Sequence, residues 1–229
     1  MKRSISRILT THAGSLPRPE ELRALITARS EGQPVDQAAL AEQLKSAVTE
    51  TVRMQVESGI DVVNDGELSK TNFTNYVRER VGGIEHRSLQ PGDAPPQLIF
   101  GRDKQEFPEY FTRGASFGTG GPGAGQGGAG QAPAFCTGPI TYKGHAAVQE
   151  DIANLQAALN GANVEEAFLP ANSPGTIEHW LRNEYYPSDE AFLYAIADAM
   201  HEEYKAIVDA GLILQIDDPD LPDAWQIYP

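Results

Sequence analysis

The sequence predicts an α/β fold in which amphipathic helices alternate with short apolar strands. Three long segments carry apolar residues at helical spacing, and apolar runs of strand length lie between them. In addition, "SGIDVVND" at 58–65 and "AGLILQID" at 210–217 each place a glycine, an apolar strand and acidic residues after a long helix. Near-continuous apolar strands flanked by such helices indicate a parallel sheet, either in a barrel or in a doubly wound fold.

The first predicted helix covers residues 37–58. Asp36 precedes it as a plausible N-cap, and Ser58-Gly59 is a usual stop signal at its end. The apolar stripe of this helix repeats every four residues and consists of Leu40, Leu44, Val48, Val52 and Val56.

Two further helices are predicted at 147–159 and 189–210. The first ends at Asn160-Gly161, and the second follows Ser188 as a candidate N-cap and stops before Gly211. Their stripes consist of Val148, Ile152, Leu155 and Leu159 in the first helix, and of Phe192, Ile196, Met200, Tyr204 and Ile207 in the second.

Strands are predicted at six places, with one unusual segment between them. The strands cover residues 8–12, 60–65, 81–86, 134–141, 167–171 and 212–217. Nine of the 21 residues in 114–134 are glycine, so this segment is predicted to be a flexible surface loop that buries no core. It lacks the pattern of a phosphate-binding loop.

Length and charge narrow the function classes. The chain has 229 residues, a net charge of −14 and an isoelectric point of about 4.7. An acidic surface repels phosphate backbones, which argues against nucleic-acid binding. No apolar run approaches the roughly 20 residues of a membrane span, and the basic N-terminus is too polar for a secretion signal. We therefore expect a cytoplasmic protein that binds small molecules, with no membrane association.

Functional residues in parallel α/β folds gather at the carboxyl ends of the strands. The residues expected there are His12, Gly14 and Ser15, then Asn64, Asp65 and Glu67, then Thr141 and Lys143, then Asn172, Ser173, His179 and Trp180, and finally Asp217, Asp218 and Asp223. Carboxylates on two strand ends could hold a cationic group such as a substrate ammonium, bind a metal, or act as acid or base. For Asp65 and Asp218 the simpler role, capping of the following helix, is favoured. For Glu67 and Asp217 both a capping role and a site role stay open.

Single residues add little by themselves. His12 has no second metal ligand at suitable spacing, so a structural hydrogen-bonding role is expected for it. Cys136, the only cysteine, lies in an apolar strand and is expected to be inert core. Trp180 could pack in the interior or offer a flat surface to a planar ligand.

Four stretches carry a resemblance to a known family: "TTHAGSLPRP", "GIDVVNDGELSK", "SPGTIEHW" and "LILQIDDPDL". They resemble the C-terminal catalytic barrel of cobalamin-independent methionine synthase, and most closely the short single-barrel relatives of that enzyme. The resemblance runs over most of residues 5–225 and implies a TIM (β/α)8-type barrel. It also implies transfer of a methyl group from a methyl-folate to the sulfur of homocysteine, with zinc holding the thiolate.

The resemblance assigns roles by motif. The family's "GS" after the first strand contacts the amino-acid end of homocysteine, and it corresponds to Gly14 and Ser15. The family's "GE" and "QIDEP" each supply a carboxylate near the substrate ammonium, which implies this role for Glu67 and Asp217. For the folate, the resemblance implies Trp180 and Asp223, the latter in place of a family glutamate. His12 receives no role.

The family's zinc ligands, a His-x-Cys pair, a glutamate and a second cysteine, lie beyond the "QIDEP" strand. The sequence ends at Pro229, so no metal ligand and no catalytic residue can be assigned, and whether the chain is an enzyme stays open. We expect residues 1–229 to be the N-terminal part of a single barrel domain, with about five of the eight βα units, and a second chain would be needed to complete it.

Two alternatives remain. The chain could be an alkyl or epoxide-to-thiol transferase of the same barrel, although a sulfonate-bearing thiol would need basic residues, and none is evident at these strand ends. It could also be a non-catalytic remnant or a half-barrel subunit.

Overall fold

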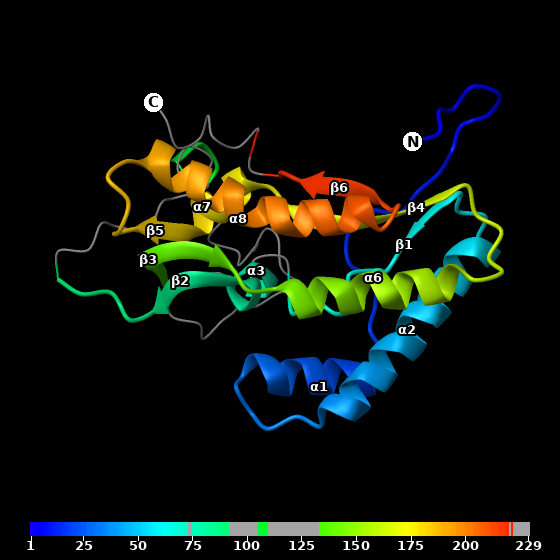
Figure 1. Cartoon of the computed structure of the whole chain (residues 1–229), viewed down its shortest axis with the longest axis horizontal. Coiled ribbons are helices and arrows are strands. Elements are labelled where there is room, and N and C mark those ends of the chain that lie inside the picture. The colour runs from blue at the N-terminus through cyan, green and yellow to red at the C-terminus, as the bar shows by residue number, and fades with distance from the viewer. Residues whose placement is uncertain (73–74, 92–104, 110–132, 220, 222–229) are drawn as a thin grey trace. The chain divides into compact units, whose positions relative to one another are not determined.

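The computed structural model of the chain describes residues 1–72, 75–91, 105–109, 133–219 and 221 (Figure 1). Two units can be distinguished within them. The first unit combines Met1–Gly82, Thr141–Asn172 and Ala197–Asp217. The second unit comprises the described parts of Gly83–Ile140, Ser173–Ile196 and Asp218–Pro229.

A parallel sheet forms the centre of the first unit. It contains β1 (Val62–Asn64), β4 (Glu166–Asn172) and β6 (Ile213–Asp217) in the order β1-β4-β6, and both neighbouring pairs are parallel. The predicted strand at 8–12 forms only a parallel bridge from Thr11 to Val62. The three named strands therefore appear in the sheet in the order in which they occur in the chain.

Each strand of this sheet follows a helix. The helices are α2 (Gln37–Glu57), α6 (His145–Leu159) and α8 (Asp189–Asp209), and α1 (Glu20–Ser30) packs against α2 (Figure 1). A helix between two parallel neighbouring strands is the βα arrangement that the sequence predicts. The three long predicted helices are thus confirmed to within two residues at each end.

The expected helix signals are present as well. Asp36 accepts hydrogen bonds from the backbone N–H groups of Ala38 and Ala39, and Ser188 accepts one from Ala191. The glycines that follow the three helices, Gly59, Gly161 and Gly211, have φ values of 78°, 79° and 80°. Glycine adopts this left-handed backbone without the steric cost that a Cβ imposes, which explains its place at these helix ends.

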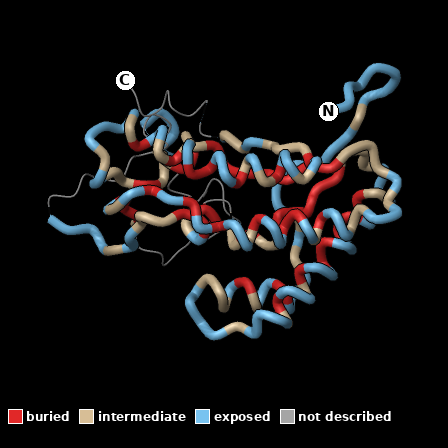
Figure 2. Tube along the Cα trace, viewed as in Figure 1, coloured by how far each residue is buried: buried red, intermediate tan, exposed pale blue. Residues whose placement is uncertain are grey.

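The core of the first unit lies between the sheet and its helices. Figure 2 shows the buried residues along β1 and β4 and on one side of α2 and α6. On the strands they are Val63, Ala167, Leu169 and Ala171, which belong to one cluster with apolar residues of α1, α2, α6 and α8. Because side chains alternate along a strand, Asn64, Phe168, Asn172 and Asp217 lie on the opposite face of the sheet.

A cluster of buried charges also belongs to the first unit. Arg80, the last residue of α3 (Asn75–Arg80), pairs with Asp151 at 2.5 Å and with Glu203 at 3.2 Å. The Tyr142 hydroxyl donates to the same Glu203 carboxylate at 2.7 Å. All four side chains are buried, so these polar groups satisfy one another.

The second unit is built around another sheet. It contains β2 (Val81–His86), β3 (Ala134–Tyr142) and β5 (Leu181–Asn183) in the order β2-β3-β5, and β3 runs parallel to β5. The short helix α7 (Pro174–Trp180) precedes β5. Ser173 caps this helix by accepting from the backbone N–H of Thr176 at 3.0 Å.

The second sheet corrects one expectation. The strand predicted at 134–141 exists, but it pairs with β2 and β5 and not with the strands at 60–65 and 167–171. An apolar run shows that a strand is favourable but carries no information about its partner.

Residues 114–132 of the predicted glycine-rich loop lie outside the described residues. Within the described ranges, no helix combines the length and apolar character of a membrane span.

Candidate functional site

The carboxyl ends of β1, β4 and β6 lie at one edge of the sheet, because the three strands are parallel. The loop from Asn64 to Glu67 follows β1, Asn172 ends β4, and Asp217 ends β6. β4 separates the other two strands, so β1 and β6 lie about 10 Å apart at the usual strand spacing. The residues that follow or end these three strands therefore lie at one edge of the same sheet.

Glu67 is the most unusual residue at the edge. Its side chain is 5% exposed, and its φ of 56° is the only positive value among the described non-glycine residues. Oε2 accepts a hydrogen bond from the Ser15 hydroxyl at 3.1 Å, and Ser15 itself is exposed. No side-chain cation lies within 4.0 Å of the Glu67 carboxylate among the residues that the structure describes. A nearly buried carboxylate thus lies directly behind a solvent-facing hydroxyl.

Close contact between two loops brings Ser15 to Glu67. The Leu16 N–H donates to the Gly66 carbonyl at 3.0 Å. Gly66 has a φ of 66°, and a Cβ at this position would lie 3.0 Å from the Thr51 side chain and 3.1 Å from Cβ of Leu16. A Cβ there would force Leu16 or Thr51 to shift, and the left-handed backbone also favours glycine, so the "GE" motif is best served by its glycine.

His12 has the structural role expected for it. Its Nε2 lies 3.0 Å from the Gly14 carbonyl oxygen, and its own carbonyl accepts from the Asn64 amide at 2.7 Å. Gly14 has a φ of 91°, and a Cβ there would meet no atom within 4 Å. The ring therefore closes the turn that carries Gly14 and Ser15, and the glycine supplies the backbone conformation of that turn.

Asp65 differs from its predicted role. It does not cap the next helix, because α3 begins only at Asn75, and its Oδ1 instead accepts from the N–H of Glu67 at 3.0 Å. Asp65 is 2% exposed. Burial disfavours its charged form and raises its pKa to about 6, although the nearby Lys70 ammonium opposes this effect.

Asp217 ends β6 opposite Asn172 and is half-buried. Its Oδ1 accepts from the side-chain amide of Gln215 at 2.7 Å. One oxygen of Asp217 is therefore engaged by an uncharged donor, as one oxygen of Glu67 is by Ser15. The structure brings Ser15 and Glu67 into contact and places Asp217 at the same sheet edge.

The residues expected to contact a planar ligand belong to the second unit or lie outside the described residues. Trp180 is the last residue of α7 in the second unit, where its ring meets that of His179 edge to face. The Trp180 Nε1 and the His179 Nε2 are buried and lack a hydrogen-bond partner within the described part of the chain. In the same unit, Asp218 accepts from the Thr176 hydroxyl at 3.3 Å. Asp223 lies outside the described residues.

Basic residues are present at the sheet edge, contrary to the sequence-based expectation. Lys70 is 4% exposed, donates to the Pro170 carbonyl and lies with Nζ 4.6 Å from the ring centroid of Tyr76. Arg18 donates to backbone carbonyls of the loop after β1. Lys70 could have been found from its place in the "NDGELSK" loop, whereas Arg18 reaches this loop from a segment 50 residues away.

The described residues contain no group of side chains suited to bind a metal ion. No cluster of three or more His, Cys, Asp or Glu side chains with metal-binding geometry occurs there. Cys136 is fully buried, as expected, and burial raises the pKa of its thiol. The described residues therefore do not fit a zinc ion, and we derive no chemical step through zinc.

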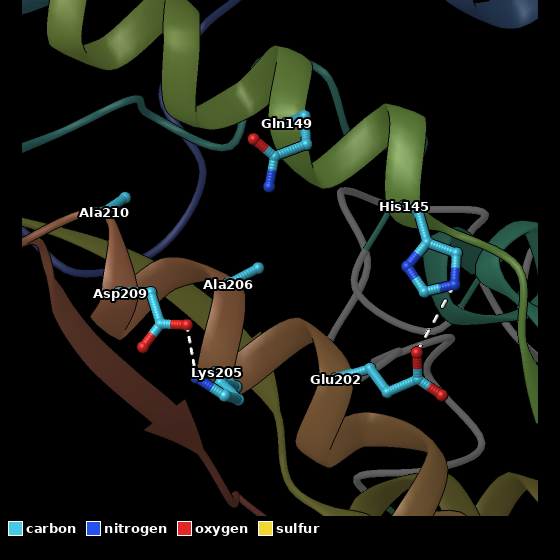
Figure 3. Close-up of a pocket in the computed structure, with 7 residues that line it drawn as sticks. All are labelled: His145, Gln149, Glu202, Lys205, Ala206, Asp209 and Ala210. Atoms are coloured by element: carbon cyan, nitrogen blue, oxygen red, sulfur yellow. Dashed lines mark hydrogen bonds and ion pairs between the residues drawn. The ribbon is translucent and has the colours of Figure 1, made fainter.

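A groove of about 480 Å³ lies on the helical side of the first unit, between α6 and α8 (Figure 3). Its polar side chains form pairs, with His145 Nε2 3.4 Å from Glu202 and Lys205 bound to Asp209. Figure 3 shows Glu202, Lys205 and Asp209 along α8, with His145 and Gln149 on the facing α6. The groove contains none of the residues predicted from sequence, so it is separate from the sheet-edge site.

Comparisons of the sequence and the fold with known proteins find similarity to one family. The family model described as "Cobalamin-independent synthase, Catalytic domain" matches residues 8–91. A methionine synthase of Sulfolobus acidocaldarius is 26% identical over 220 residues, which cover 96% of this chain and 54% of that protein. One of Pyrococcus horikoshii is 24% identical over 211 residues, which cover 92% and 51%. The chain spans about half the length of the curated relatives it matches.

Solved structures agree on the fold. A B12-independent methionine synthase from Shewanella sp. W3-18-1, solved in complex with selenomethionine, has a TM-score of 0.61 at 20% identity. The superposition covers 92% of this chain and 51% of the Shewanella chain. A putative vitamin-B12 independent methionine synthase from Listeria monocytogenes has a TM-score of 0.57 at 19% identity, with coverages of 93% and 53%. The resemblance seen in the sequence motifs is confirmed, as is an α/β fold similar to that of these proteins.

Proposed function

We propose that the first unit of this chain, which is similar to cobalamin-independent methionine synthases, binds the amino-acid end of homocysteine. In this proposal the complete protein transfers a methyl group from a methyl-folate to the homocysteine sulfur, in the cytoplasm. The match of residues 8–91 to the catalytic-domain model supports this, because that segment contains Gly14, Ser15 and Glu67.

The Glu67 carboxylate is the observation that carries the proposal. It is 5% exposed and has an uncharged donor, Ser15, as its hydrogen-bond partner. A buried anion is costly unless a cation pairs with it. A substrate ammonium placed against Glu67 would provide that cation and form charge-assisted hydrogen bonds to the carboxylate.

Other residues complete the amino-acid site in this proposal. Asp217 at the end of β6 approaches the ammonium as a second carboxylate, and the Gln215 amide fixes its orientation. The exposed turn at Gly14 and Ser15 faces the substrate carboxylate, since glycine lets a ligand approach the backbone closely. The ammonium is thus held between two carboxylates, and the thiol extends away from them.

The methyl donor is assigned to other parts of the protein. We assign Trp180, together with Asp223, to the folate, because the Trp180 indole N–H is buried without a partner among the described residues. Zinc would supply a deprotonated thiol at neutral pH. Its ligands would have to come from outside the described residues, since these offer no group of metal-binding side chains.

Alkyl or epoxide transfer to a sulfonate thiol is less favoured. The two basic residues at the sheet edge, Arg18 and Lys70, direct donors at backbone carbonyls, and this leaves the edge dominated by carboxylates.

Isothermal calorimetry with homocysteine tests the proposal. Glu67→Gln preserves the shape of the side chain and removes its charge, so we expect binding to weaken by tenfold or more, as about 1.5–3 kcal/mol per charged hydrogen bond implies. Glu57→Gln is the matched control, because Glu57 is an exposed glutamate on α2. Equal homocysteine affinity in the wild type and Glu67→Gln would contradict the anchor role.

A further inference from the structure

We propose that Arg18 and Arg29 form an arginine clamp that fixes the loop Glu67–Lys70 and thereby aims the Glu67 carboxylate at its ligand. Both are positioning residues in this proposal, since they act through the backbone and not on the substrate. The inference rests on the proposed role of Glu67 as an ammonium anchor.

The clamp is defined by its hydrogen bonds. Arg18 donates from Nη2 to the carbonyl of Glu67 at 2.7 Å and to that of Lys70 at 2.5 Å, and from Nε to that of Leu68 at 2.9 Å. Arg29 donates from Nη2 to the carbonyl of Ser69 at 2.8 Å. Four successive carbonyls, from residue 67 to residue 70, are therefore held by two guanidinium groups.

Arginine is suited to this task because its planar group carries five N–H donors in a fixed geometry. Carbonyls just beyond a strand have lost their ladder partners and must be satisfied in another way. Glu67 adds a second need, because a left-handed backbone at a non-glycine residue persists only where its surroundings enforce it. The clamp provides hydrogen-bond donors for the carbonyls and also holds the backbone of Glu67 in place.

The arrangement also leaves the charge of Glu67 available. Arg18 approaches the backbone of Glu67, yet no ion pair joins it to a carboxylate within 4.0 Å among the described residues. An arginine that paired with the carboxylate would compete with a substrate ammonium. Binding the carbonyls instead orders the loop without neutralising its acidic side chain.

Arg29 links the clamp to the next helix. It lies 3.5 Å from the carboxylate of Glu79 on α3, and the other oxygen of Glu79 accepts from the Thr71 hydroxyl at 2.5 Å. The second half of the loop and α3 are thus tied to the same arginine. We expect Arg18 to control the position of Glu67 and Arg29 to control the second half of the loop.

Amide hydrogen exchange tests the clamp without any ligand. We expect amides of residues 66–70 to exchange at least tenfold faster in Arg18→Gln than in the wild type, with a smaller increase in Arg29→Gln. Arg18→Lys should recover only part of the protection, because an ammonium lacks the planar fork. Arg53→Gln is the control, since Arg53 is exposed and pairs with glutamates of its own helix.

A second measurement connects the clamp to the ligand. The affinity for homocysteine is compared with that for 4-sulfanylbutanoic acid, which lacks the amino group, and the ratio reports ammonium recognition. We expect a ratio of ten or more in the wild type and in Arg53→Gln, and a ratio reduced at least threefold in Arg18→Gln.

The outcomes separate the two proposals. A wild type without preference for the amino group contradicts the anchor, and the exchange rates then still decide whether the arginines hold the loop. Unchanged exchange at residues 66–70 in Arg18→Gln overturns the clamp, as does an unchanged ratio in that variant beside a lowered ratio in Glu67→Gln.

Discussion

At the scale of single residues, Asp65 and Glu67 follow the same strand but do different things. Asp65 accepts the N–H of Glu67 and closes a tight turn, whereas the carboxylate of Glu67 meets a serine hydroxyl. The raised pKa of Asp65 follows from its complete burial. Asp65 therefore belongs to the architecture of the turn, whereas the Glu67 carboxylate faces the Ser15 hydroxyl.

The pKa of Asp65 predicts a pH dependence of stability. A rise from the ordinary value of 3.8 to about 6 means that the folded state holds a proton that the unfolded state has lost. The contribution of Asp65 to the free energy of unfolding should therefore decrease as the pH rises from below 4 to above 6, by about 3 kcal/mol in total. Asp65→Asn removes this titration, so its stability relative to the wild type should increase over that range.

Urea unfolding at several pH values measures this difference. Asp198→Asn is the control, because Asp198 is exposed on α8 and should shift stability little at any pH. Parallel pH profiles for the wild type and Asp65→Asn would show that Asp65 titrates normally in the folded chain.

At the scale of elements, helices were more predictable than strand partners. The helices α2, α6 and α8 have long apolar stripes, good caps and glycine stops, and all three were predicted. The helices α1 and α7 were not, because α1 buries only Leu22 and Ile26 and α7 has seven residues. The sequence predicts the strand at 134–142 but not the sheet that it joins, since its pairing depends on residues far away in the chain.

The N-cap of α2 gives a prediction at this scale. Asp36 accepts from Ala38 at 3.0 Å and from Ala39 at 3.2 Å. Asp36→Ala leaves these N–H groups without their acceptor, so we expect the free energy of unfolding to fall by about 1 kcal/mol. Urea denaturation measures the change. Glu42→Ala on the exposed side of the same helix should have a smaller effect, and equal losses in the two variants would mean that the cap contributes nothing specific.

The site also contains some residues that the sequence predicts and others that it does not. Ser15, Glu67 and Asp217 could be proposed from sequence because each lies at or within three residues of the end of a predicted strand, and the structure puts Ser15 in contact with Glu67. Arg18 and Arg29 could not be proposed, because they bind carbonyls 40 to 52 residues away. Any sequence offers a carbonyl at each of these positions, so no residue type marks the contact.

At the scale of the whole molecule, charges are buried in the interior as well as at the sheet edge. Arg80 of α3 joins Asp151 of α6 to Glu203 of α8, and therefore connects three helices of the first unit. One cation serves two carboxylates, with the Tyr142 hydroxyl as an additional donor. Loss of the arginine would leave two buried anions without a counter-ion.

Arg80→Met tests the importance of this cluster. We expect the free energy of unfolding to decrease by about 3–5 kcal/mol, because an unpaired buried charge is strongly destabilising. Combining it with Asp151→Asn and Glu203→Gln should restore part of the loss in urea denaturation. Arg53→Met, which removes exposed ion pairs, should cost about 1 kcal/mol or less. A similar small loss in Arg80→Met would contradict the structural role of the cluster.

A crystal structure of the chain with bound homocysteine tests the central claim most directly. The quantity that decides it is the distance from the ligand nitrogen to the carboxylate oxygens of Glu67. We predict about 2.7–2.9 Å, the usual length of a charge-assisted hydrogen bond, with the ligand carboxylate at Gly14 and Ser15. A ligand whose nitrogen lies away from Glu67, or one bound in the groove between α6 and α8, would contradict the proposed anchor.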